Sequence, residues 1–374
     1  MSRQSGKQGQ RFGLAGALLA GLFLGSGCSD TPSGDSPEPA DSGQTDTVMS
    51  VWTFDAAADD LRAASCPAGT ASADPEPFSV DVDAVSLGDP AEEATQLNIV
   101  DLAGAWILSS DREAFGGLSG LAVQNGDTLL AVSDAGAFVT LALDPDTGAP
   151  TGEAGFAPMT DVEGRELAGK RRGDAEGLAL RDGLALVSFE RDHRILAFDL
   201  DGCGANAAGA LVARLPDRIG EDRVGSNQGP EALALTSEGH VQVGYELGGA
   251  SPSPVGTLQR DGTLAAVERL AHPLDHRLTG LDAVTLATGE QRRVALYRAY
   301  DPVRGNRTLV QVLPFGAIVP AAAFTLQPPL VVDNFEGVAA HPLLDGRTRL
   351  YLIADDNFNE SQRTLLFAFD LRVN

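Results

Sequence analysis

The sequence predicts an all-β fold of the propeller class, and three observations support this prediction. From about residue 80 onward, short alternating apolar runs are separated by Gly and Asp, without a convincing long amphipathic helix. One phrase recurs in this region: a small or acidic residue, then Gly or Ala, then an aliphatic residue that opens a strand. The copies lie 51 to 57 residues apart, a period that suits one four-stranded blade with its loops and exceeds most solenoid repeats.

The copies of this first phrase begin at five positions: Ser119, Glu176, Glu231, Asp282 and Glu336. A second phrase follows each of them after a turn and a β-rich run, and in four units it ends on a carboxylate: Asp134, Glu190, Glu246 and Asp355. The fourth unit has Arg298 near the equivalent place. Five units therefore lie between residues 117 and 374, and the segment from about 80 to 112 could join the last strands to close a ring. We predict a single propeller of six blades, with five or seven blades as alternatives.

Residues 1–27 have the pattern of an export signal. A basic start precedes an apolar run over residues 12–24, which is too short to span a membrane and ends in small residues before Cys28. Small residues before a cysteine resemble the bacterial lipoprotein cleavage box, which implies a lipid attached to Cys28; an ordinary signal peptide is the alternative. Residues 28–47 are rich in Ser, Pro, Gly and Asp and predict a disordered tether. Residues 48–374 form the predicted domain, with its repeat-bearing core at about 80–374.

The composition limits the partners and the compartment. The chain has 52 acidic and 27 basic residues and a net charge of −25, so nucleic acid is not an expected partner. The lipid would be the only contact with the membrane, and Ser29 after the anchor cysteine favours the outer membrane of the cell envelope. Without the signal, Cys66 and Cys203 are the remaining cysteines. In an oxidising compartment they predict one disulfide, with two buried free thiols as the alternative.

The leading carboxylates predict a metal site. The innermost strand of each propeller blade lines a central channel, so a residue that recurs once per blade faces its counterparts around a ring. Like charges that meet in this way must be neutralised. Ca²⁺ accepts six to eight oxygen ligands and fits such a cluster, while protonation, backbone N–H groups or arginines are other routes. Each acid could instead only bracket a strand start. The predicted metal ligands are Glu176, Glu231, Asp282 and Glu336.

The second set of carboxylates predicts acid–base chemistry. Beside a cation that polarises a phosphoryl or acyl oxygen, one of these groups could serve as general base. The predicted catalytic residues are Asp134, Glu190, Glu246 and Asp355. Because arginine forks suit phosphate and carboxylate oxygens, substrate binding is predicted for Arg191, Arg298 and Arg363. Serine chemistry is not favoured, since Ser119 lacks the second glycine of a nucleophile elbow.

Several segments resemble signature segments of the phytase-like esterase family. These segments are residues 115–121, 174–178, 227–233, 333–338 and 354–367. The resemblance extends over roughly residues 100–374 and implies a β-propeller with esterase-like or phytase-like activity. Two departures from the pattern are Asp282, where Glu-Gly recurs in other units, and Ala232, which replaces a glycine.

The expected function is that of an envelope-anchored, divalent-cation-dependent hydrolase of phosphomonoesters or other small esters, with Ca²⁺ as the expected cation and a small anionic or ester substrate. Two alternatives remain. One is a non-catalytic propeller that binds a ligand or a protein at the cell surface. The other is a lactone hydrolase similar to the gluconolactonase propellers, which share the acid-lined channel.

Overall fold

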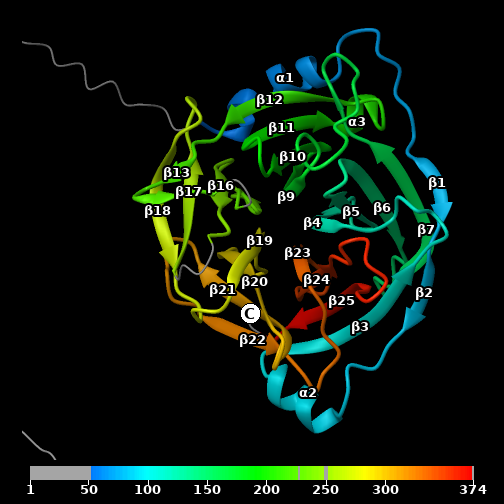
Figure 1. Cartoon of the computed structure of the whole chain (residues 1–374), viewed down its shortest axis with the longest axis vertical. Helices are drawn as coiled ribbons and strands as arrows, with labels where there is room; N and C mark the ends of the chain where they lie inside the picture. The colour runs from blue at the N-terminus through cyan, green and yellow to red at the C-terminus, as the bar shows by residue number, and fades with distance from the viewer. Residues whose placement is uncertain (1–51, 226–227, 248–251, 373–374) are drawn as a thin grey trace, which may run out of the picture. The chain divides into compact units, whose positions relative to one another are not determined.

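A computed structural model of the protein describes residues 52–225, 228–247 and 252–372. Over these residues, five sheets of four or five strands surround a central channel (Figure 1). The predicted all-β propeller is confirmed. It has five blades, one of the two alternatives, and not six. The signal peptide, the tether and Cys28 lie outside the described residues.

The inner strands of the blades follow one another along the chain, and consecutive strands of each blade run outward from the channel; in the first, second and fifth blades an earlier segment adds the outermost strand or strands. The first contains β4 (Leu118–Gln124), β5 (Thr128–Ser133), β6 (Ala137–Leu143), β7 (Pro150–Pro158) and, outermost, β1 (Glu76–Ser79). The second contains β9 (Ala175–Arg181), β10 (Leu184–Phe189), β11 (Arg194–Asp199), β12 (Ala208–Arg214) and the short parallel strand β8 (Thr160–Asp161). The third contains β15 (Ala232–Leu235), β16 (Val241–Gly244), β17 (Ser253–Leu258) and β18 (Leu264–Leu270). The fourth contains β19 (Arg277–Thr285), β20 (Gln291–Asp301), β21 (Gly305–Pro314) and β22 (Ala322–Leu326).

The fifth blade is built from both ends of the domain. From the channel outward it contains β23 (Phe335–Pro342), β24 (Thr348–Ala354), β25 (Thr364–Leu371), β3 (Val100–Ser109) and β2 (Asp81–Ala84). Strands β3 and β25 are antiparallel, with Trp106 opposite Leu366. The segment before residue 112 therefore supplies two outer strands to the last blade, which closes the ring and explains why there is no sixth blade among the described residues.

Glycines let the inner strands approach one another closely. A Cβ atom on Gly337 would lie 2.2 Å from the backbone oxygen of Ser119, and one on Gly120 would lie 2.6 Å from that of Glu176. In the fourth blade the equivalent residue is Gly280, whose added Cβ would lie 2.8 Å from the backbone oxygen of Glu336. The repeated phrase of the fourth unit therefore begins at Thr279, and the sequence alignment that placed Asp282 there is wrong by three residues.

Apolar cores lie between neighbouring blades. Between the first two blades, for example, Phe138 meets Phe198 edge-to-face with ring centroids 5.1 Å apart, a favourable aromatic geometry. Apolar side chains point from both faces of each sheet into these cores, so the sequences of the strands are nearly continuous apolar runs. The packing holds the inner strands, and with them the residues of the channel, at fixed positions.

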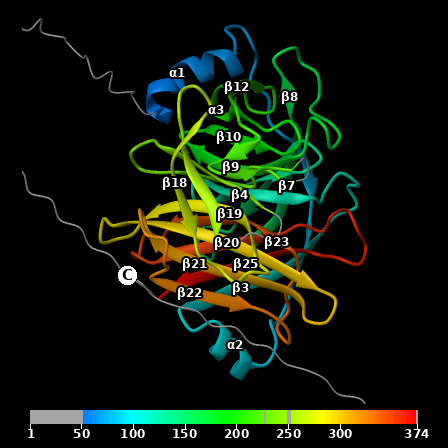
Figure 2. The ribbon, with the colours of Figure 1, turned by 60° about the vertical axis from the view of Figure 1, so that its left-hand side comes forward.

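Three helices lie outside the blades in the described chain. Helix α1 (Phe54–Ser65) packs on β11 and β12, and α2 (Pro90–Gln96) lies beside β22 (Figures 1 and 2). Helix α3 (Leu200–Cys203) follows β11, and a short hairpin of β13 (Arg218–Ile219) and β14 (Asp222–Arg223) precedes the third blade. A disulfide between Cys66 and Cys203, with Cα atoms 5.6 Å apart, joins the end of α1 to the second blade. Over the described residues, no helix has the length and apolar character needed to cross a bilayer.

Candidate functional site

The starts of the inner strands place three of the recurring acids in one cavity of about 140 Å³. Glu176 is the second residue of β9, Glu336 is the second residue of β23, and Glu231 directly precedes β15. Strand pairing is irregular at this point of β23 and at the corresponding points of β4 and β19. Such bulges re-aim side chains, here at the channel end where the acids are found. Ser119 occupies the same place in the first blade and donates a hydrogen bond of 3.3 Å to Glu336.

The second set of recurring acids lines the same cavity. Each of these residues follows the second strand of its blade: Asp134, Glu190, Glu246 and Asp355. The two phrases of a unit belong to neighbouring antiparallel strands. The carboxylate at the end of the second strand therefore lies at the same end of the channel as the residue that starts the first strand. The acids that recur along the sequence therefore form two sets that lie at a single centre.

Three cationic side chains enter this centre. Lys170 donates to Asp134 and, at 2.9 Å, to Asp174. Arg191 approaches Asp174 at 2.6 Å. Arg298 lies 3.0 Å from Glu336 and 3.5 Å from Glu246. Arg298 therefore takes the place in the fourth blade that a carboxylate takes in the others, and it neutralises part of the charge on both sets of acids.

Negative charge still exceeds positive charge. Eight carboxylates and three cations line the cavity. Glu176 and Glu231 are 9% and 8% exposed, and neither carboxylate has a hydrogen bond or an ion pair with any other described residue. Buried charges are normally paired or bound to a cation, so these two side chains identify an incompletely neutralised centre.

The pKa values reflect this environment. Burial, followed by the charges of Glu336 and Asp174, holds the pKa of Glu176 well above its usual range. Burial and then the charge of Glu176 do the same for the pKa of Glu231. Burial also raises the pKa of Glu190 to about 7 and that of Asp355 to about 8, with smaller contributions from neighbouring acids. In the absence of a cation, several of these groups would retain a proton near neutral pH.

One part of the centre has the dimensions of a cation site. Carboxylate oxygens of Asp174, Glu176 and Glu190 lie within 4.8 Å of one another. Two oxygens on opposite sides of one Ca²⁺ ion are about 4.6 to 5.2 Å apart, because each bond is about 2.3 to 2.6 Å long. The donor set, which consists of carboxylate oxygens only, fits a hard cation.

Two predicted residues lie elsewhere, and two participants were not predicted. Asp282 is a half-buried residue of β19 that faces β23, where it accepts hydrogen bonds from the backbone N–H groups of Ala283 and Ala340, both at 2.7 Å. Arg363 pairs with Asp333 at 3.2 Å and does not line the cavity. Lys170 and Asp174, by contrast, belong to the centre although neither recurs once per blade. The position of Asp174, two residues before Glu176, was the available signal in the sequence.

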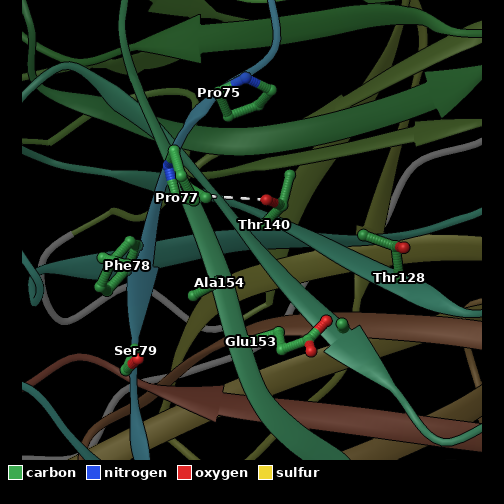
Figure 3. A pocket seen from close by; sticks show the side chains of 10 residues that line it. Pro75, Pro77, Phe78, Ser79, Thr128, Thr140, Glu153 and Ala154 are labelled. Carbon is green, nitrogen blue, oxygen red and sulfur yellow. Dashed lines mark hydrogen bonds between the residues drawn. The ribbon is translucent and has the colours of Figure 1, made fainter.

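The outer wall has a cavity of a different kind. It measures about 530 Å³ and lies between the segment Pro75–Ser79 and strands β5 to β7 of the first blade (Figure 3). Its lining includes Pro75, Pro77 and Phe78, and Glu153 is its one charged lining residue in the described chain. It therefore lacks the group of titratable side chains that characterises the channel.

The fold and the site together define a five-bladed propeller with an acid-lined central channel. A sequence model of the phytase-like family, described as esterase-like activity of phytase, matches residues 113–358. The chain belongs to this family.

The other similarities to known proteins are distant. No curated protein sequence matches this chain. An endo-arabinase from Bacteroides thetaiotaomicron is 11% identical, with 70% of this chain and 96% of that chain covered and a TM-score of 0.45. A PQQ-bound aldose sugar dehydrogenase from Streptomyces coelicolor is 14% identical, with 71% and 97% covered and a TM-score of 0.37. A glutaminyl cyclase from Myxococcus xanthus is 12% identical, with 68% and 91% covered and a TM-score of 0.39.

Proposed function

We propose that this protein is a hydrolase of phosphomonoesters or other small esters that depends on a divalent cation, with Ca²⁺ as the expected ion. The supporting observation is the pair of buried carboxylates, Glu176 and Glu231, that no described residue neutralises. Family membership supports ester hydrolysis as the class of reaction.

The cation would be held by Asp174, Glu176 and Glu190, with Glu231 beside them in the same cavity. When bound, it would act as a Lewis acid toward a phosphoryl or acyl oxygen. Its charge would also allow the neighbouring carboxylates to ionise together, which their mutual repulsion opposes in its absence.

Asp355 is the best candidate for proton transfer in this centre. Its pKa of about 8, raised by burial, lies close to neutral pH, where a group can both give and take a proton efficiently. The backbone N–H of Asn357 donates to its carboxylate at 2.6 Å and fixes its orientation. Asp355 is not held in an ion pair by any described residue, whereas Asp134 is paired with Lys170 and Glu246 with Arg277.

The positive side chains have a complementary role. Arg298 is fixed by Glu336 and Glu246 and lines the cavity, so its guanidinium can contact an anionic substrate group that enters the channel. Lys170 and Arg191 enter from the side of Asp174 and offset its charge. These cations make the approach of an anion to an acidic centre less unfavourable.

The proposal includes a location outside the cytoplasm, in the cell envelope. The disulfide between Cys66 and Cys203 supports an oxidising compartment. The lipid anchor at Cys28 remains a prediction from the sequence, and mass spectrometry of the protein from membranes would test it.

The test of the catalytic proposal is turnover of p-nitrophenyl phosphate, p-nitrophenyl acetate and phytate with Ca²⁺ and with chelator. We expect turnover of at least one substrate that chelator abolishes and Ca²⁺ restores. Glu231→Gln should fold normally and lose most turnover, whereas Asp282→Asn, the same type of change at a half-buried carboxylate outside the cavity, should retain it. Absence of turnover on every substrate, together with a melting temperature that chelation leaves unchanged, would favour the non-catalytic alternative.

A further inference from the structure

A second cavity adjoins the acidic centre. It measures about 500 Å³, within the usual range for small-molecule sites. Arg298 and Asn357 line both this cavity and the channel centre, so the two spaces meet at these side chains. Asn334, which also lines it, donates a hydrogen bond of 2.9 Å to Glu336 of the channel centre.

The charged groups of this adjoining cavity are already compensated. Arg298 is paired with Glu336 and Glu246. Asp333, which is 6% exposed, is paired with Arg363 and accepts from Asn306 at 3.2 Å. Arg298, which the proposed function assigns to the ester group in the channel, is the one cation among the described residues of the lining, so the rest of the cavity offers an anionic ligand no positive partner.

The remaining lining is neutral and polar. It consists of side-chain amides and hydroxyl groups: Tyr300, Asn306, Asn334, Asn357, Ser361 and Gln362. An amide both donates and accepts hydrogen bonds, as a sugar hydroxyl does. An apolar ligand would leave these groups without partners at a cost for each. The chemistry of the lining thus favours an uncharged ligand with several hydroxyl groups.

An aromatic ring completes the cavity. Tyr300 is 66% exposed on β20, in the part of the β20–β21 hairpin that also contributes Asn306 to the lining. A flat aromatic face packs against the C–H face of a pyranose ring while amides around it bind the hydroxyl groups. An exposed tyrosine at the rim of an amide-lined cavity suits a ligand that is polar at its edge and apolar on its face.

We propose that this cavity is a subsite for the sugar-like polyol portion of the substrate. The polyol would bind between Tyr300 and Gln362, and the ester group would enter the channel beside Arg298. This inference rests on the proposed hydrolase for the role of the ester group, but the binding of the polyol itself does not depend on catalysis.

Binding is tested directly with the full chain by saturation-transfer NMR in chelator, with D-glucose, D-galactose, D-mannose and L-arabinose as probes. We expect at least one sugar to bind, and Tyr300→Ala and Gln362→Leu each to weaken that binding about tenfold or more, equivalent to a loss of about 1.4 kcal/mol. Val303→Ala, on the same hairpin but outside the cavity, is the matched control and should bind normally. No binding of any sugar by the unmodified chain, or equal binding by both cavity variants, would overturn the proposal.

A kinetic measurement separates the subsite from the proposed activity. For glucose 1-phosphate, both cavity variants should raise KM with a smaller change in kcat, and for p-nitrophenyl phosphate they should leave KM within about twofold. If the chain hydrolyses neither compound but still binds a sugar through Tyr300 and Gln362, the hydrolase proposal fails and the subsite stands. If it hydrolyses both with a KM that neither variant changes, the subsite fails and the hydrolase stands.

Discussion

The substitution Glu190→Gln tests whether burial of the channel acids, together with their mutual repulsion, destabilises the chain without a cation. Burial, with the charge of Asp174, raises the pKa of Glu190 from 4.5 to about 7. A group with a raised pKa binds more protons in the folded state, so its contribution to stability is complete below about pH 4.5 and is lost as the pH rises through about 7. At about 1.4 kcal/mol per pKa unit, ionisation of Glu190 would lower the free energy of unfolding at pH 8 by roughly 3 kcal/mol.

In chelator, Glu190→Gln should therefore unfold with a free energy roughly 3 kcal/mol higher than the unmodified chain at pH 8, and less than about 1 kcal/mol higher at pH 5. For a domain of this size the pH 8 difference corresponds to a rise in Tm of roughly 4 °C. Thermal and chemical denaturation at both pH values measure it. A variant no more stable than the unmodified chain at pH 8 would refute the reasoning.

Asp282→Asn is the control that separates burial from cation binding. Burial raises the pKa of Asp282 to about 7. In chelator, the difference in unfolding free energy between this variant and the unmodified chain should therefore depend on pH in the same way as the difference for Glu190→Gln. Ca²⁺ at a hundred times its Kd should stabilise the unmodified chain and Asp282→Asn by about 2.7 kcal/mol. Glu190→Gln should lose most of that gain, because it removes a proposed ligand.

Further outcomes follow from the closure and packing of the ring. Replacement of Cys66 and Cys203 by serine should lower the free energy of unfolding by about 2 to 5 kcal/mol in chemical denaturation and leave turnover unchanged; equal stability would contradict a structural role. Deletion of residues 81–112 removes β2, α2 and β3 and should abolish the cooperative thermal transition seen by circular dichroism, whereas a retained sharp transition would show that the ring closes without them. Gly337→Ala, whose Cβ would lie 2.2 Å from a backbone oxygen, should lower the free energy of unfolding by about 1 to 3 kcal/mol. The reverse change at the equivalent position of the third blade, Ala232→Gly, should lower it by about 1 kcal/mol. A smaller loss for Gly337→Ala than for Ala232→Gly would contradict the close approach.

The fold class was predictable because each blade repeats a local pattern, but the number of blades was not. Whether the segment around Trp106 pairs with the last strand or begins a blade of its own depends on contacts across more than 250 residues, which no local pattern records. The fourth unit was ambiguous for a similar reason. Residues 279–281 and 282–284 both fit the phrase, and only the approach of Gly280 to Glu336 distinguishes them.

The channel acids were predictable to the extent that they recur. Glu176, Glu231 and Glu336, with all four acids of the second set, line one cavity as a periodic sequence on a ring requires. Lys170 could not be found in this way, because it lies in the loop before β9 and does not recur once per blade. The adjoining cavity could not be predicted from the sequence either, because its amides come from the fourth blade, from the loop before β23 and from the loop after β24.

The pairing of β3 with β25 also bears on the order in which the protein is assembled. Strand β25 follows the other blade strands in chain order and lies between β24 and β3, so its pairing with β3 joins the two ends of the ring. Acids of the first and fifth blades, such as Asp134 and Asp355, become neighbours only when the ring closes, so their repulsion opposes closure and not the formation of individual sheets. A calcium-rich or mildly acidic medium would accordingly favour completion of the ring, and a chain held in neutral chelator would remain open for longer.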